Sequence, residues 1–251
     1  MPGRQARHPK DVAFAIAACA ALTWYNNVAG QWAWHRRWYP VVNAAAAGAA
    51  LAAATASGLT AGDLGLRPDR LRSGLRLGAA AAAPVTAAYA AAVLTPAARP
   101  VLNDTRVTGL TGPQRAYHVL VRIPVGTVGW EETAFRGVLR AALRRVLTEP
   151  AATVTASAMF GIWHIRPTVE ALDSNERAPG RIARVAALTA VVAGTAAGGA
   201  LLSFLRDRSG SLAAPVMAHL AINCTGALAG AAAARLDRRA GVRRAASSTR
   251  P

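Results

Sequence analysis

The sequence is poor in charged residues, and acidic residues are the scarcest. Of 251 residues only 12 are Asp or Glu, and all charged residues together make up 16%, against about 25% in typical soluble domains. Lys10 is the only lysine, so arginine supplies nearly all of the 29 basic side chains. With 53% apolar residues and a mean hydropathy of +0.24, this composition argues against an ordinary soluble domain and favours a membrane protein.

Cysteine is almost absent as well. Cys19 and Cys224 are the only two, and both lie in apolar segments with no spacing typical of a metal site or a disulfide framework. We interpret both as small core residues.

The basic excess is large, with a net charge of +17, and such a charge can attract nucleic acid. The arginines, however, form short clusters between apolar runs, where they anchor helix ends in lipid headgroups. The clusters are Arg36–Arg37, Arg67 to Arg76, Arg144–Arg145 and Arg235 to Arg244. We therefore expect membrane lipids as partners and no nucleic acid.

Long apolar stretches predict helices that cross a bilayer core, which requires roughly 17 to 25 residues each. They cover 12–30, 41–57, 75–97, 116–147, 182–205 and 212–234, and a seventh at 151–165 is short. Because 63 residues are alanine, hydropathy understates these spans. No long alternating pattern of a barrel occurs, so we predict an all-α, polytopic bundle of about seven (six to eight) helices.

This organisation predicts four regions. They are a basic tail at 1–10, N-terminal transmembrane helices and basic loops at 11–115, a core of further helices at 116–235, and a basic, disordered tail at 236–251. The first apolar run resembles a signal peptide, but later segments also need the membrane, which favours a retained helix.

Two segments have unusual patterns. The leucines and arginines of 57–78 fit either an amphipathic segment on the membrane surface or an ordinary basic connector. The 116–147 stretch is longer than one bilayer core, and Pro124, Gly126 and Gly129 predict a kink before Trp130.

Ionisable residues inside apolar helices are costly and mark candidate functional sites. They occur at Glu131, Glu132 and Arg136, at His164, and at His219 with Asn223. Glu132 with Arg136, Phe160 with His164, and His219 with Asn223 are each four residues apart, so each pair shares a helix face. Three helices can therefore bring polar faces to one cavity.

Each of these candidate site residues also has a purely structural interpretation. Glu132 and Arg136 fit an intrahelical ion pair, Glu131 alone fits a solvated helix end, and a lone histidine is usually a satisfied core residue. His8, His35 and His118 lack comparable neighbours, and we interpret them as structural or interfacial.

Carboxylates beside imidazoles in a low-dielectric pocket are suited to activating water, either alone or around a metal. The set of His164, His219 and Glu131 with an open position corresponds to a catalytic zinc site. The sequence has no HExxH motif, so the usual zincin helix is excluded.

These motifs carry a family resemblance. The order of Glu131-Glu132-x-x-Phe135-Arg136-Gly137, Phe160-x-x-x-His164 and His219-x-x-x-Asn223 resembles the three motifs of the CPBP intramembrane metalloproteases. This family, also called Abi or type II CAAX prenyl protease-like, includes the eukaryotic Ras and a-factor converting enzyme and bacterial bacteriocin-processing or immunity proteins. The resemblance covers about 116–235, which it implies is the catalytic core, and the flanking segment 210–215 also fits.

The resemblance implies an intramembrane endopeptidase that cleaves CAAX-type prenylated or bacteriocin-like membrane-associated substrates, and it implies a bacterial plasma membrane as the location. Glu131 would activate water together with His164. His219 and Asn223 would bind the metal or stabilise the oxyanion, whereas Glu132 and Arg136 would orient Glu131. Zn²⁺ and a metal-free glutamate mechanism both stay open.

Two other classes compete with the protease. One is a non-proteolytic immunity or scaffold protein that keeps the fold, and the other is a transporter with a proton-linked site. A transporter usually has two matching halves with broken helices, which the sequence does not show. The intact set of Glu131, His164, His219 and Asn223 favours the protease.

Overall fold

The computed structural model describes residues 8–175 and 180–248, with side chains described as far as 240, and no strand occurs in this part of the chain. The long helices are α1 (Pro9–Asn27), α3 (Tyr39–Ala56), α4 (Leu71–Leu94), α10 (Arg181–Ser209) and α12 (Gly226–Ser248). The shorter ones are α2 (Ala33–Arg37), α5 (Thr105–Thr108), α6 (Gly112–Tyr117), α7 (Arg140–Val146), α8 (Glu149–Trp163), α9 (Ile165–Ser174) and α11 (Ala213–Leu220). Three 3₁₀ turns, η1 (Ala29–Gln31), η2 (Pro68–Arg70) and η3 (Pro96–Leu102), lie in connecting segments.

Five helical segments are long and apolar enough to cross a membrane. They are Pro9–Gln31, Tyr39–Ala56, Pro68–Leu94, Arg181–Ser209 and Ala213–Ala240. The predicted all-α polytopic bundle is confirmed. The stretches 116–147 and 151–165 are helical too but are not among the five, because the first carries many charges and α8 has only 15 residues.

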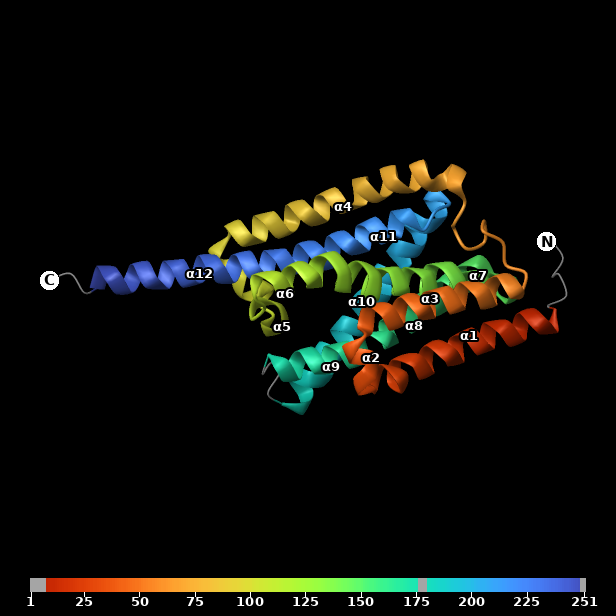
Figure 1. Ribbon diagram of the computed structural model, residues 1–251, viewed down its shortest axis with the longest axis horizontal. Helices are drawn as coiled ribbons and strands as arrows, with labels where there is room; N and C mark the ends of the chain where they lie inside the picture. The colour runs from red at the N-terminus through yellow and green to blue at the C-terminus, as the bar shows by residue number, and fades with distance from the viewer. Residues whose placement is uncertain (1–7, 176–179, 249–251) are drawn as a thin grey trace.

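The helical run from α6 to α7 is the centre of the bundle. In Figure 1 it lies between α11 and α12 on one side and α3 and α1 on the other, while α4 covers α11 and α12. Phe135 and Leu139 from this run are fully buried among α1, α3 and α8. The run therefore presents its side chains to every neighbouring helix.

Most of this central run has π-helical winding, in η4 (His118–Gly129) and η5 (Glu132–Leu139). The amide of Asn43 on α3 donates to the Gly126 carbonyl at 2.5 Å. Gly126 also lets α3 approach, because a Cβ there would lie 2.6 Å from the Tyr39 ring. A wider winding thus replaces the simple kink that the glycines and Pro124 predict, a feature common at functional sites.

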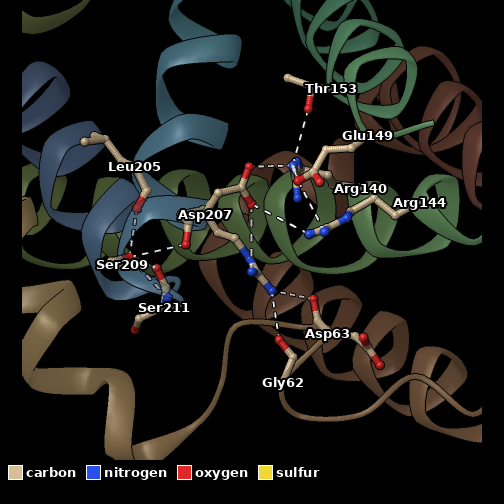
Figure 2. A network of polar contacts seen from close by, with 11 residues as sticks. Gly62, Asp63, Arg140, Arg144, Glu149, Thr153, Leu205, Asp207, Ser209 and Ser211 are labelled. Carbon is tan, nitrogen blue, oxygen red and sulfur yellow. Dashed lines mark hydrogen bonds and ion pairs between the residues drawn. The ribbon is translucent and has the colours of Figure 1, made fainter. Parts of the chain in front are cut away.

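A buried polar network ties together one end of the bundle (Figure 2). Arg140 donates to Asp207 at 2.5 Å and to Glu149 at 3.3 Å. Arg206 donates to the carbonyl oxygens of Gly62 and Asp63 at 3.0 and 2.5 Å. The network links the segment before α4 to α7, α8 and α10.

The segment 57–78 is therefore a packed connector. Leu59 and Leu64 are buried in a cluster with α3 and the central run, and α4 already begins at Leu71. The structure favours the connector over an amphipathic segment that lies on the membrane.

The C-terminal region differs from the disordered tail expected from residue 236. Helix α12 continues to Ser248 and projects beyond the bundle in Figure 1. Alanine and arginine are strong helix formers, and Asp237 pairs with Arg99 at 2.9 Å. Residues 1–7 and 249–251 of the two predicted tails lie outside the described residues.

Candidate active site

A cavity of about 840 Å³ opens at the end of the bundle opposite the Arg140 network. Helix α8 connects the two ends, because it begins at Glu149 in that network and ends at Trp163 beside the cavity. Three residues singled out from the sequence line it: Glu131, His164 and Asn223. The structure thus brings three separate motifs to one space.

Glu131 is almost completely buried, with 6% of its surface exposed. The indole Nε1 of Trp163 donates to its Oε1 at 3.2 Å. Its Oε2 is buried and has no hydrogen-bond partner among the described residues, and the Nε2 of His219 lies 3.9 Å away. One carboxylate oxygen is therefore held in place and the other is left to accept a hydrogen bond.

Glu132 faces away from the cavity and joins a buried ion pair. Its Oε1 accepts from Arg136 Nη1 at 3.0 Å and from His219 Nδ1 at 2.7 Å. The side chains of Glu132 and Arg136 are 0% and 2% exposed. This is the intrahelical ion pair that the i, i+4 spacing predicts, and it also fixes the His219 ring.

Phe160 supports the cationic and imidazole side chains. The Arg136 guanidinium lies 3.9 Å from the Phe160 ring centre, and the rings of His164 and His219 contact the same phenyl group at centroid distances of 4.5 and 6.1 Å. A single aromatic ring therefore packs against groups from three helices.

His164 stands at the junction of α8 and α9. Its Nδ1 lies 2.7 Å from the Phe160 carbonyl oxygen, and since a carbonyl only accepts, Nδ1 carries the proton. The Nε2 of the neutral ring is then a hydrogen-bond acceptor. Asn223, on the π-helical turn η6 (Ala221–Thr225), lines the cavity with an amide that can donate or accept.

Two features of the cavity wall are not predicted from the sequence. Trp163, the donor to Glu131, immediately precedes His164, but its own pairing leaves no signal in the sequence. His35 is buried against Tyr25 and Asn43, with its Nε2 3.0 Å from the Tyr25 hydroxyl and 3.1 Å from Asn43 Oδ1. Burial lowers the pKa of His35, so its ring is neutral at neutral pH. His35 and His118 both line the cavity.

Residues 113–225 match the family model described as type II CAAX prenyl endopeptidase Rce1-like. This part of the chain is similar to the Rce1-like family. The match nearly coincides with the predicted core at 116–235 and includes all six candidate site residues. No curated protein and no solved structure matches the chain. The family gives the chain the general role of a CAAX-type membrane endopeptidase, consistent with an integral membrane protein.

In this Rce1-like site, Glu131 and His219 form a pair and are not part of a larger group of side chains that surrounds a metal ion in the described residues. Glu131 and His219 are neighbours at 3.9 Å, but no group of three or more His, Cys, Asp or Glu side chains in the described residues could hold a metal ion. A zinc site of His164, His219 and Glu131 is not assembled in this arrangement. Zinc therefore stays a prediction from the sequence.

Gly161 sets the distance between α8 and α10, and thereby the position of His164. A Cβ at Gly161 would lie 2.6 Å from the Val192 carbonyl oxygen. We expect Gly161→Ala to destabilise the Rce1-like core by about 1–3 kcal/mol, because overpacking forces the helices apart. Thermal unfolding in detergent measures this effect.

The matched control is Gly194→Ala on α10, where a Cβ meets nothing within 4 Å. This substitution should leave stability unchanged or raise it by about 1 kcal/mol, since alanine is the better helix former. Equal unfolding temperatures for the two variants would contradict the close contact at Gly161.

Proposed function

We propose that the chain is a multi-pass endopeptidase of a bacterial plasma membrane that hydrolyses peptide bonds of membrane-associated substrates, CAAX-type prenylated or bacteriocin-like. The observation that carries this proposal is Glu131, which lines a cavity together with His164 and Asn223 and whose buried Oε2 has no hydrogen-bond partner among the described residues. Its partners would be membrane lipids and a lipid-associated peptide or protein, not nucleic acid.

In this mechanism Glu131 is the general base. Its Oε2 accepts a proton from a water molecule, and the hydroxide oxygen attacks the peptide carbonyl. The Trp163 hydrogen bond holds the other carboxylate oxygen in position. Glu131 then returns the proton to the leaving nitrogen as the carbon–nitrogen bond breaks, and the carboxylate is restored.

The remaining site residues orient the water and stabilise the intermediate. The Nε2 of His164 can accept a hydrogen bond from the second O–H of this water, which stays bonded to the oxygen, so His164 supports the attacking geometry. The Asn223 amide can donate to the oxyanion, an interaction worth about 2.7–4 kcal/mol in well-studied hydrolases. Glu132 and Arg136 hold His219 beside Glu131. The positioning contacts thus come from three separate helices.

Cleavage of a lipidated peptide tests this proposal. We expect the purified chain in detergent to hydrolyse the peptide and to place one ¹⁸O atom from labelled water in the new carboxylate, measured by mass spectrometry. His164→Ala should lower kcat by about 10²-fold, because the attacking water loses the hydrogen bond that orients it. His8→Ala, an exposed histidine at the start of α1, is the control and should retain parental activity.

Failure of the folded parent to cleave such peptides would favour the alternative, a non-proteolytic immunity or scaffold protein. The same preparation decides between the two hydrolytic routes by metal analysis. Stoichiometric zinc that is lost in both His164→Ala and His219→Ala supports the metal route, whereas metal-free protein that is fully active supports glutamate alone.

A further inference from the structure

The cavity contains a cation that the proposed mechanism does not use. Arg122, on η4, lines the same cavity as Glu131. Its guanidinium lies 4.2 Å from the centre of the Tyr39 ring on α3. Because a cation over an aromatic face is attracted by the ring, this contact fixes the direction of the arginine. Arg122 is thus a half-buried, oriented charge.

Of the three other arginines that line the cavity, Arg36 is exposed to solvent, and the remaining two have acidic partners. Arg106 pairs with Asp104 at 2.6 Å. Burial raises the pKa of Asp104, but hydrogen bonds from Arg106 and Asn175 outweigh it and bring the pKa to about 2. Arg166 lies 3.7 Å from Glu170. Both cations are therefore already balanced by carboxylates of the chain.

Arg122 differs from these arginines, because it forms no hydrogen bond or ion pair within the described residues. A partly desolvated cation is costly unless an anion pairs with it, and the Tyr39 ring supplies only part of that compensation. The guanidinium presents a planar fork that matches a carboxylate. An anion from outside the chain is the partner that this arrangement lacks.

The separation of Arg122 and Glu131 indicates how far from the cleaved bond such an anion would lie. Arg122 precedes Glu131 by nine residues, which is at most about 13 Å along the axis, because π-helical winding rises less per residue than the α-helical value. Ideal α-helical winding would put the two on opposite faces, but the π-helical winding of η4 lets both line the cavity. An extended peptide covers about 3.3–3.6 Å per residue, so this separation corresponds to no more than about four residues.

We propose that Arg122 binds a carboxylate of the peptide substrate no more than about four residues from the bond that is cleaved. This inference rests on the proposed endopeptidase function and adds a determinant of specificity to it. The carboxylate can come from the chain terminus of the substrate or from an acidic side chain. Arg122 is then a binding residue that selects where the substrate is cut.

Three lipidated peptides of one sequence test the proposal. The first ends in a free carboxylate three residues after the cleaved bond, the second ends there in an amide, and the third is an amide with glutamate at that position. We expect the parent to cleave the first about 10- to 100-fold more efficiently than the second, the range for a charge-assisted hydrogen bond. The third peptide shows whether a side-chain carboxylate can replace the terminal carboxylate at this position.

Arg122→Gln should reduce kcat/KM for the acid peptide to the parental value for the amide, mainly through KM, and should leave the amide peptide unaffected. Arg122→Lys should restore part of the difference. Arg37→Gln is the control, because Arg37 also lies over an aromatic ring, at 5.9 Å from Trp38, but does not line the cavity.

Equal losses on the acid and amide peptides in Arg122→Gln would assign Arg122 a structural role and overturn the proposal. So would a parent that cleaves all three peptides equally well. A folded parent that cleaves none of them contradicts the endopeptidase function itself, which is a different result.

Discussion

Glu131→Gln is expected to lower kcat by about 10²–10⁴-fold, the contribution typical of a general base, with KM and the unfolding temperature close to those of the parent. Glutamine keeps the oxygen that accepts from Trp163 Nε1 at 3.2 Å. It replaces the unpartnered Oε2 by an amide nitrogen, which cannot take a proton from water. Steady-state cleavage of a lipidated peptide in detergent measures the loss.

The control for this variant is Glu149→Gln, an identical chemical change at the other end of α8. Glu149 is 57% exposed and pairs with Arg140 and Arg144, far from the cavity that Glu131 lines. Its kcat should equal that of the parent. Full activity of Glu131→Gln would remove Glu131 from the mechanism and leave the cavity without a base.

It was possible to predict from the sequence that the three motifs share one cavity, because acidic residues and histidines are rare in apolar helices. Glu131, His164 and Asn223 do line one cavity, and the four-residue spacing of Glu132 and Arg136 does form an ion pair. These contacts depend on local helical geometry and on the cost of burying charge, which are both visible in a single sequence.

Contacts that depend on helix winding or on distant neighbours could not be predicted in this way. Arg122 and Glu131 would lie on opposite faces of an α-helix. Only the π-helical winding brings them to one cavity, so sequence reasoning does not single out Arg122 as a site residue. His35 reaches Asn43 only because α2 folds back on α3. The pairing of His219 with Glu132 spans 87 residues, and no local pattern encodes it.

Arg136→Met is expected to be the most destabilising of the substitutions considered, at about 3–5 kcal/mol, because it leaves a buried carboxylate without its counter-charge. Glu132 is fully buried and Arg136 is 2% exposed. Methionine fills a similar volume, so the loss reports charge rather than a cavity. For a domain of this size we expect the unfolding temperature to fall by roughly 6–20 °C, measured in detergent.

Two further variants separate the buried charge from other effects. Arg166→Met breaks another i, i+4 pair, but Arg166 and Glu170 are 46% and 57% exposed, so it should cost no more than about 0.5 kcal/mol. Adding Glu132→Gln to Arg136→Met removes the uncompensated charge while its oxygen still accepts from His219 Nδ1. The double variant should therefore be more stable than Arg136→Met, yet less active if the pair positions His219 beside Glu131. A double variant as unstable as Arg136→Met would show that lost contacts with Phe160, 3.9 Å from the guanidinium, dominate instead.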